Sequence, residues 1–594
     1  MRLDFEKSIK KLVVFWGKWV VLAVLISVMG CRPEEKPLQL VHQGQSPYQI
    51  VIPTNASPST RHASQELQAY LREISGVVLP IVTEKDPASK YQILIGKGER
   101  VRKLLKKQEI DWNELGDEGF AIWTRGNHLI IAGGDLRGTL YGVYTFLEEV
   151  LGCRWWSSDA QSYPRTESIS FQPLRIRQRP AFEYREVFFF DARDNNWAAR
   201  NKINGFNAQL NELQGGKFPW AFPHFHTFDW VLPEGKYFKQ HPEYFAWVEN
   251  NRRSPVSICY SSTGAVLEAT ANVKEWMRKN PDKRIFSVSQ RDWPYRCGCA
   301  GCAQLDAKYG CPMGSMLTFV NKIAEGVAGE FPQNYVQTLA YDYSMKAPNG
   351  LRPATNVLIT VATMTGGWEK EVQNWTRLTD KVYLWDYMTG FSHFLVPFPN
   401  REQLESYAKF YRQHGVKGVL SQGNYQDPGG DFPELKAWLL AKLFWNPDFN
   451  VPKGIDEFFE GYYQSAAEPM RQYFDLMHKH LKEPDPEGAA DKRYEAVTKG
   501  WWLRQPVSNY LNQKAMKEYQ SLFDRAEILA SKDPVLLLRV QKQRLNLYTM
   551  ELAALPKDDY RRASIIKKYL DICARAKIHR YGEFKSLAEA KAAF

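Results

Sequence analysis

The spacing of hydrophobic and polar positions divides the chain into three blocks. In the first, residues 38–175, short apolar runs surround an amphipathic stretch at 59–74 whose apolar residues recur at helical spacing. The runs at 48–53, 91–95, 119–124 and 128–132 predict strands, and 136–151 predicts a helix that ends at Gly152. We therefore expect a small α/β sandwich domain at the N-terminal side.

In the second block, residues 180–460, strand-like runs alternate with helical stretches. Helices are predicted at 265–279, 314–330, 401–414 and 434–444. Strands joined by helices form parallel sheets, and eight such units predict a (β/α)8 TIM barrel. The eight runs are 184–191, 204–210, 255–262, 284–292, 335–344, 356–364, 381–388 and 416–425.

The third block, residues 461–594, carries apolar residues at three- and four-residue spacing. This pattern predicts a C-terminal α-helical bundle that packs on the barrel. Its expected helices are 495–511, 513–530, 534–555 and 558–576.

Composition narrows the class of protein. The chain has 594 residues, of which 44% are hydrophobic and 24% charged, which excludes a disordered, fibrous or multi-span membrane protein. Aromatic residues make up 14% of the chain, a richness that serves either stacking on sugar rings or large cores. The net charge of +12 is spread along the whole chain rather than gathered in a stripe, so no nucleic-acid partner is expected.

Residues 1–31 read as an export signal rather than as folded structure. Basic residues precede an uncharged, mostly apolar run at 19–30, which is shorter than the roughly 20 residues of a membrane span. The run ends at Cys31, in a sequence that resembles a bacterial lipoprotein box; the alternative is an ordinary signal peptide with an incidental cysteine. We expect an exported protein, lipid-anchored through Cys31 to the bacterial outer membrane and facing the periplasm or the surface.

Carboxylates stand where several predicted barrel strands end. Catalytic groups of such barrels project from the C-terminal strand ends, where this chain has Asp191, Asp292, Asp342 and Asp386. Glycosidic bond cleavage needs an acid for the leaving oxygen and a second group for the positive sugar centre. The alternative is that a strand-end Asp caps the following helix. We predict Asp292 as the general acid and Asp386 as its partner.

Polar and aromatic side chains on or near the same strand ends are the predicted substrate contacts. Amides and hydroxyls suit sugar hydroxyls, and aromatic rings can stack on the apolar face of a sugar. The predicted contacts are Arg185, His226, Gln290, Tyr341, Asp342, Trp385, Tyr387, His393, Gln422, Asn424 and Tyr425.

A cysteine cluster is the remaining feature of the second block. Cys297, Cys299 and Cys302, with Cys311 nine residues on, have a spacing that suits a structural zinc site. Disulfides are the alternative in an exported chain, with Cys311 or Cys259 as partners. Neither arrangement is expected to be catalytic, and no cofactor is expected for catalysis.

Two resemblances add a family. The sequence at 138–149 and 151–156 resembles the accessory N-terminal domain of α-glucuronidases and β-hexosaminidases. The segments at 226–228, 237–246, 287–292, 339–341, 384–387 and 422–430 resemble glycoside hydrolase family 163, a former domain-of-unknown-function family, over most of residues 40–480. That resemblance implies a metal-independent endo-β-N-acetylglucosaminidase acting on complex N-glycans, with a TIM barrel.

The chain departs from the family pattern at Ser421, where a glutamate is more usual, and around Asp292, flanked here by Arg291 and Trp293. The expected function is a cell-envelope glycoside hydrolase whose partner is a glycan or glycoprotein substrate. If the sugar is N-acetylglucosamine, its acetamide can act as the nucleophile. The alternatives are a non-catalytic glycan-binding lipoprotein, which Ser421 makes worth testing, and an exo-acting hexosaminidase or glucuronidase.

Overall fold

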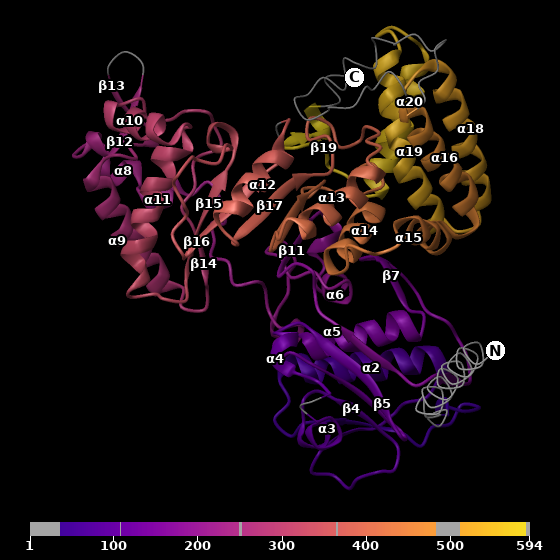
Figure 1. Cartoon of the computed structure of the whole chain (residues 1–594). Helices are drawn as coiled ribbons and strands as arrows, with labels where there is room; N and C mark the ends of the chain where they lie inside the picture. Colours follow the sequence, from indigo (N-terminus) through magenta and orange to yellow (C-terminus); the bar gives the residue numbers. More distant parts are fainter. Residues whose placement is uncertain (1–35, 107–108, 249–251, 364–365, 483–510, 590–594) are drawn as a thin grey trace, which may run out of the picture.

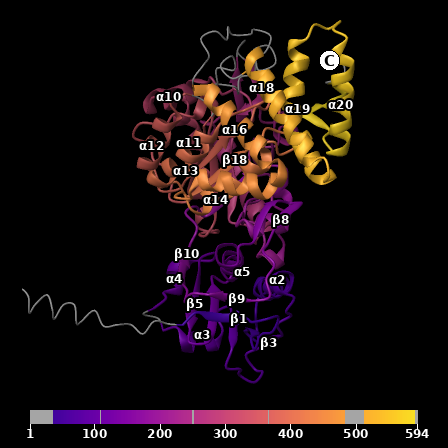
Figure 2. The ribbon, with the colours of Figure 1, turned by 90° about the vertical axis from the view of Figure 1, so that its right-hand side faces the viewer.

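The computed structural model describes residues 36–106, 109–248, 252–363, 366–482 and 511–589. It shows a mixed α/β protein in which an N-terminal sheet domain and a group of C-terminal helices flank a central parallel sheet (Figures 1 and 2). The predicted signal segment with Cys31 and most of the predicted helix at 495–511 lie outside the described residues. None of the helices in the described part of the chain has the length and apolar character that a membrane span requires.

The N-terminal domain is built on a six-stranded sheet of order β10-β5-β6-β4-β2-β3. Its strands are β2 (Gln49–Ile52), β3 (Ile81–Thr83), β4 (Gln92–Ile95), β5 (Phe120–Arg125), β6 (His128–Gly133) and β10 (Arg175–Gln178). The strands predicted from the apolar runs are therefore present. Two short antiparallel pairs complete the domain: β1 (Leu38–Val41) with β9 (Ile169–Phe171), and β7 (Arg154–Ser157) with β8 (Ala160–Ser162).

Two helices pack together beside this sheet. Helix α2 (Pro58–Ser75) begins at Ser57, whose side chain accepts a hydrogen bond from the Thr60 N–H, and ends at Gly76, whose φ of 76° suits a residue without Cβ. Helix α5 (Gly138–Thr145) continues into a π-helical turn at Phe146–Val150. Together they cover most of the helix predicted at 136–151. The smaller helices are α3 (Glu99–Leu104) and α4 (Trp112–Leu115).

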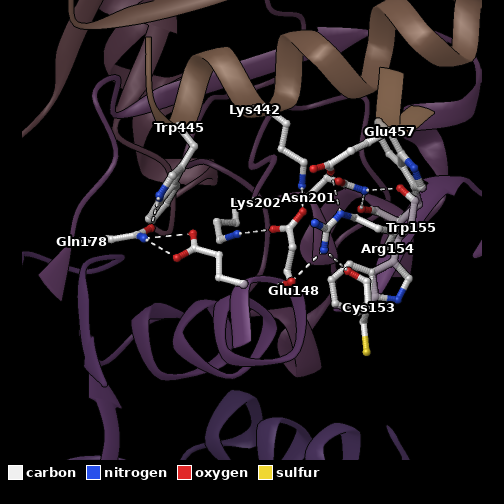
Figure 3. Close-up of polar contacts among 12 residues, drawn as sticks. Glu148, Cys153, Arg154, Trp155, Gln178, Asn201, Lys202, Lys442, Trp445 and Glu457 are labelled. Atoms are coloured by element: carbon white, nitrogen blue, oxygen red, sulfur yellow. Dashed lines mark hydrogen bonds and ion pairs between the residues drawn. The ribbon is translucent and has the colours of Figure 1, made fainter. Parts of the chain in front are cut away.

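Buried ion pairs join the N-terminal domain to the central domain (Figure 3). The Glu148 carboxylate pairs with Lys442 through one oxygen and lies 3.4 Å from Nζ of Lys202 through the other. Arg154 donates to the Glu148 carbonyl at 2.7 Å and pairs with Glu457 at 3.2 Å. Burial raises the pKa of Glu148, but the two ammonium groups outweigh burial and bring it to about 2.

Glu148→Gln is expected to destabilise the fold by about 3–5 kcal/mol at neutral pH, because it leaves two buried ammonium groups without their anion. The folded pKa of Glu148, about 2, lies below the unfolded value, so the stabilisation is present above the unfolded pKa and lost as pH falls through 4.5 toward 2. Thermal unfolding of both proteins at pH 7 and pH 3 measures this. The difference between them should shrink at pH 3; an equal difference at both values would contradict the account.

The central domain contains a six-stranded, all-parallel sheet of order β11-β18-β17-β16-β15-β14 that curls into part of a barrel. Its strands are β11 (Tyr184–Phe188), β14 (Ile285–Ser287), β15 (Tyr335–Ala340), β16 (Val357–Ala362), β17 (Val382–Tyr387) and β18 (Gly418–Gln422). Six of the eight predicted barrel strands are present. The prediction of strands at 204–210 and 255–262 as members of this sheet is wrong.

Side chains supply much of the pairing at the first of these positions, beside one backbone hydrogen bond from the Asn204 N–H to the Arg185 carbonyl at 3.3 Å. The Arg185 N–H donates to the side-chain oxygen of Asn204 at 2.9 Å, and Glu186 accepts from the Asn207 N–H at 2.9 Å, so residues 204–207 follow β11 without forming a strand. A second irregular segment bridges to the far edge, where the Ala221 N–H donates to the Ile285 carbonyl at 2.8 Å. Irregular backbone thus fills the gap between β11 and β14.

The second missing strand belongs to a hairpin. Residues predicted from Pro255 onward form part of β13 (Arg252–Ile258), which pairs antiparallel with β12 (Phe245–Val248). Figure 1 shows this hairpin beside α10 (Ala300–Tyr309) at the outer end of the central domain, away from the C-terminal helices. An apolar run of this length has the same pattern in a hairpin strand as in a barrel strand, so periodicity could not show which sheet the strand joins.

Helices cover the outer face of the curled sheet. The longer ones are α9 (Thr263–Lys279), α11 (Met313–Ala328), α12 (Trp368–Leu378), α13 (Arg401–Gln413) and α14 (Pro433–Trp445). Shorter helices elsewhere in this part of the chain are α6 (Asn195–Arg200), α7 (Phe228–Val231), α8 (Glu234–Tyr237) and α15 (Val451–Phe458).

The C-terminal part contains α18 (Gln513–Ala530), α19 (Pro534–Ala554) and α20 (Arg561–Arg575), close to three of the predicted helices. It also contains α16 (Ala467–Lys482), for which no helix was predicted. It also contains an unpredicted hairpin of β19 (Arg580–Gly582) and β20 (Lys585–Ser586). In Figure 1 this yellow hairpin lies between the helices and the central sheet.

Candidate active site

Alternation of side chains along the parallel strands decides what faces the interior of the curled sheet. Tyr383 of β17 belongs to an interior cluster, and Trp385 packs against it. Since successive strand residues point to opposite faces, Tyr387 follows on the same side, whereas Leu384 and Asp386 face the helices. The other buried members of the interior cluster are Tyr184, Trp220, Ile285, Leu358 and Leu420.

Asp292 lies at the C-terminal edge of this sheet, in the loop after β14. The Tyr341 hydroxyl, just after β15, donates to Oδ1 of Asp292 at 2.7 Å. The His226 ring lies 6.0 Å from the Tyr341 ring, and its Nδ1 is 2.8 Å from the Gln290 carbonyl oxygen. Asp292 is exposed, so its carboxylate is open to a ligand while a phenol orients it.

A second carboxylate reaches the same edge from the C-terminal hairpin. Glu583, directly after β19, accepts a hydrogen bond from the Tyr425 hydroxyl at 3.0 Å and from the Gln422 amide at 3.4 Å. The Gln422 oxygen in turn accepts from the Trp385 indole N–H at 2.9 Å. Glu583 is therefore tied to the ends of β17 and β18.

Hydrogen bonds to a carboxylate and to a backbone carbonyl of the central domain fix the position of the β19–β20 hairpin. Asp427 accepts hydrogen bonds from the N–H groups of His579 and Arg580, at 2.8 and 3.1 Å. The Glu583 N–H itself donates to the Phe391 carbonyl at 2.8 Å. These bonds fix the backbone on both sides of Gly582, so Glu583 has a defined place at the edge of the sheet.

The charge of Asp292 acts on Glu583. Burial raises the pKa of Glu583, the hydrogen bond from Tyr425 opposes that rise, and the charge of Asp292 adds to it. Burial, with the nearby Asp292 and Glu583 charges among its further causes, also raises the pKa of Tyr341 and Tyr387 above the usual range. Both phenols therefore remain protonated and able to donate hydrogen bonds near neutral pH.

Aromatic rings surround these polar groups. The Phe225 and Trp385 rings lie 4.6 Å apart, and the Tyr425 ring stacks on Phe188 at 4.2 Å. The edge of the sheet thus presents two carboxylates among rings, an arrangement suited to binding a sugar and protonating its glycosidic oxygen.

The structure contradicts the prediction that Asp386 is the catalytic partner of Asp292. Asp386 is fully buried on the helix-facing side of β17, where Tyr411 of α13 donates to it at 2.8 Å and Ser421 of β18 donates to its other oxygen. Burial raises the pKa of Asp386 to about 7, and the two hydroxyl bonds oppose that rise. Its position at a strand end was predicted correctly, but its side chain leaves the sheet on the opposite face from Trp385 and Tyr387.

Asp386→Asn is therefore expected to leave turnover within about threefold of the wild type, since the side chain contacts no part of the strand-end cluster. Because the folded pKa of Asp386, about 7, lies above its usual value of 3.8, the stability contributed by its protonated form is full below 3.8 and is lost as pH rises from there through 7. The neutral asparagine lacks this loss. Kinetics together with melting temperatures at about pH 4 and pH 8 check both points; a large loss of turnover in a folded protein would return Asp386 to the catalytic site.

Three predicted substrate contacts have structural partners instead. Arg185 is fully buried at the N-terminal end of β11, with Nη1 2.7 Å from the Glu118 carboxylate. The Gln290 amide donates to the Ser344 hydroxyl at 2.7 Å and braces the loop after β15. The buried Asn424 amide donates to two backbone carbonyls of its own loop, at 2.9 and 3.0 Å. The contact predictions for Arg185 and Asn424 are wrong because these side chains serve the fold.

Three further predicted residues have other surroundings. Asp342 is exposed and opens a 3₁₀ turn at Asp342–Ser344 with a φ of 52°. His393 packs 4.9 Å from the Tyr581 ring of β19, and burial, with Lys585 next, lowers its pKa to about 3. Asp191 accepts a hydrogen bond from the Ser158 N–H at 2.8 Å, at the contact with the β7–β8 pair. The structure brings together Asp292 with His226, Tyr341, Trp385, Tyr387, Gln422 and Tyr425.

Sequence reasoning missed Glu583 and Phe225. Glu583 follows Tyr581 and Gly582, where the helical spacing of the third block ends. That break is the only signal that the segment is not helical, and it gives no hint of where the carboxylate lies. Phe225 stands in a run of aromatic and histidine residues at 224–228, of which only His226 was predicted as a contact.

The predicted cysteine set needs one change. Cys259, Cys297, Cys299 and Cys302 lie together, whereas Cys311 lies apart, with Sγ 3.3 Å from the Lys346 carbonyl oxygen. The prediction that Cys311 completes the cluster is wrong, because the end of β13 brings Cys259 to that place.

Comparisons with known proteins match two parts of the chain. The family model described as "Domain of unknown function (DUF4838)" matches residues 155–475, and the one described as "Glycosyl hydrolase family 67 N-terminus" matches residues 37–146. Among curated protein sequences nothing matches the chain.

One solved structure shares the fold. A family GH115 4-O-methyl-α-glucuronidase with specificity for decorated arabinogalactans superposes with a TM-score of 0.56 at 15% identity, covering 91% of this chain and 78% of that one. A β-N-acetylhexosaminidase from Bacteroides fragilis has a TM-score of 0.40 at 13% identity, covering 71% of this chain and 92% of its own. At 15% identity the first likeness shows the fold alone.

Proposed function

The chain belongs to the DUF4838 family, and from the strand-end cluster we propose that it is a glycoside hydrolase. The observation that carries the proposal is that Asp292 and Glu583, from distant parts of the chain, lie at the same edge of the sheet among aromatic rings, close enough for the Asp292 charge to act on Glu583. The family 67 N-terminal match and the fold shared with a GH115 glucuronidase support the same class of enzyme.

The two carboxylates differ in a way that assigns their roles. A general acid must hold its proton near neutral pH, and Glu583 is the one whose pKa burial and a neighbouring charge raise. Asp292 is exposed and is oriented by the Tyr341 hydroxyl, so its carboxyl group is open to the sugar and is the one placed to stabilise positive charge there. Glu583 is thus the proposed acid, in place of Asp292, and Asp292 the proposed partner, in place of Asp386.

The proposed reaction is endo-β-N-acetylglucosaminidase cleavage of complex N-glycans, the activity implied by the resemblance to glycoside hydrolase family 163. In such a substrate the acetamide of the sugar attacks its own anomeric carbon while the glycosidic bond breaks and its oxygen takes the proton of Glu583, and water then hydrolyses the ring that has formed. Asp292 would hold and stabilise the acetamide. Tyr387 and Tyr341 are placed to donate hydrogen bonds to it. The proposed location is the bacterial outer membrane, through a lipid on Cys31.

The position of Ser421 removes the main argument for a non-catalytic glycan-binding protein. Ser421, the departure from the family pattern, donates its hydroxyl to Asp386 on the helix-facing side of the sheet and is fully buried. Neither Asp292 nor Glu583 depends on it. An exo-acting α-glucuronidase is the second candidate, because of the fold shared with the GH115 enzyme.

Incubation of the purified protein with complex N-glycoproteins and with nitrophenyl glycosides of N-acetylglucosamine and glucuronic acid tests the proposal, with mass spectrometry of the products. The expected products are a free oligosaccharide and a protein that keeps a single N-acetylglucosamine on asparagine. Release of uronic acid alone would select the second candidate. Binding of glycans without any cleavage would contradict both.

A further inference from the structure

Four cysteine thiols meet beside the loop that carries Asp292. Cys259 directly follows β13, Cys297 and Cys299 precede α10, and Cys302 lies in the first turn of α10. Their Sγ atoms all lie within 4.8 Å of one another, and those of Cys259 and Cys299 are 3.6 Å apart. Cys259, Cys297 and Cys302 are buried, so the group is enclosed rather than spread over the surface.

The spacing fits a tetrahedral metal ion. Zinc held by four thiolates at about 2.3 Å sets the sulfur atoms about 3.8 Å apart. A disulfide joins only one pair of sulfur atoms, at about 2.05 Å, and leaves no reason for a second pair to converge on the same point. Four mutually close thiols therefore suit a single ion better than separate bridges.

The surroundings suit a negatively charged thiolate group. The Trp247 N–H donates to Sγ of Cys297 at 3.2 Å. The Ser261 hydroxyl lies 3.3 Å from Sγ of Cys299 and 3.4 Å from Sγ of Cys302. The Arg253 guanidinium interacts electrostatically with Cys259, Cys297 and Cys299. Four thiolates around Zn²⁺ carry a net double negative charge, which these donors and the cation stabilise.

We propose that Cys259, Cys297, Cys299 and Cys302 bind one Zn²⁺ as a structural site. The ion would join the end of β13 to the start of α10. Zinc rather than a harder cation is expected because all four ligands are soft thiolates.

The site would also fix the Asp292 loop. Arg291 donates to the Pro255 carbonyl and Trp293 to the Val256 carbonyl, both at 2.8 Å, so the loop lies along β13 on either side of Asp292. Further on, the Gly298 N–H donates to the Trp247 carbonyl of β12 at 2.8 Å. The ion would fasten the C-terminal end of the loop to the end of β13, while β14 fixes its N-terminal end. The proposal of a metal site does not depend on the proposed function. Only the further consequence, that the ion helps to position a catalytic Asp292, rests on that function.

Metal analysis of the protein purified without added zinc gives the first test. The expected content is one zinc per chain, and removal of the metal by a strong chelator should expose the four thiols to a thiol reagent without any reductant. Iron in place of zinc, no metal, or disulfide-linked peptides among these four residues would overturn the proposal. This measurement needs no variant.

Paired variants give the second test. Cys259→Ser is expected to lower zinc content at least about tenfold, whereas Cys311→Ser, also buried but outside the group, should keep one zinc per chain. Should Cys259→Ser fail to fold, Cys299→Ser serves instead, since Cys299 is the least buried ligand. Loss of zinc in Cys311→Ser, or full retention in both ligand variants, would contradict the assignment.

Discussion

Glu583→Gln is expected to lower turnover of a natural glycan roughly 10²–10⁴-fold while sparing an activated nitrophenyl glycoside, because only the natural leaving group needs a proton from the enzyme. Gln keeps the shape of the side chain and its hydrogen bond from Tyr425 but cannot give a proton. Steady-state kinetics on both substrates measure the two effects. The upper limb of the pH profile, which reports the acid, should disappear with the carboxyl group.

Glu589→Gln is the matched control, since Glu589 is an exposed glutamate in the same C-terminal segment and accepts its hydrogen bonds from Ser586. It should leave both activities unchanged. Equal losses on the two substrates for Glu583→Gln would show that Glu583 does not act as the acid. Near-normal turnover of both substrates would remove it from the site.

Asp292→Asn is expected to lower turnover on both substrates, by roughly 10²–10³, because positive charge develops on the sugar whatever the leaving group. Asn still accepts the Tyr341 hydrogen bond, so the loop should keep its place and the protein its melting temperature. Kinetics on the two substrates, next to thermal unfolding, check this.

Asp282→Asn is its control: an exposed Asp just before the N-terminal end of β14, whereas Asp292 follows the C-terminal end. It should behave as the wild type. A loss confined to the natural glycan for Asp292→Asn would mean that Asp292 is the acid, as the sequence alone predicted, and that the roles proposed from the structure are reversed.

The strands that carry the site could be predicted from the sequence. Which face of the sheet each side chain occupies could be predicted only in part. The runs that end at Tyr341, Tyr387 and Gln422 are apolar enough to mark strands, and parallel strands bring their ends to one edge. Asp386 stands between Trp385 and Tyr387, so alternation alone places it on the other face. Asp292 lies five residues past the end of β14, where alternation no longer applies.

Contacts between distant residues explain the remaining errors. Glu583 meets Tyr425 across 158 residues, and no local pattern encodes that meeting. Cys259 lies 40 residues before Cys299, so the closer spacing of Cys311 was misleading. Arg185 reads as a strand residue near the site, yet its partner Glu118 belongs to the other domain. In each case tertiary packing, rather than local propensity, chose the neighbour.

The central claim is that Asp292 and Glu583 together form the catalytic site of a glycoside hydrolase. Turnover of the cleaved glycan by the double variant Asp292→Asn/Glu583→Gln, measured beside the wild type, tests it most directly, with glycan binding followed by calorimetry. The account predicts that the wild type releases sugar. The double variant should lose about as much turnover as the more damaging single variant, because the two groups act as a unit. It should still bind the glycan. Turnover by the folded double variant within about tenfold of the wild type would contradict the claim.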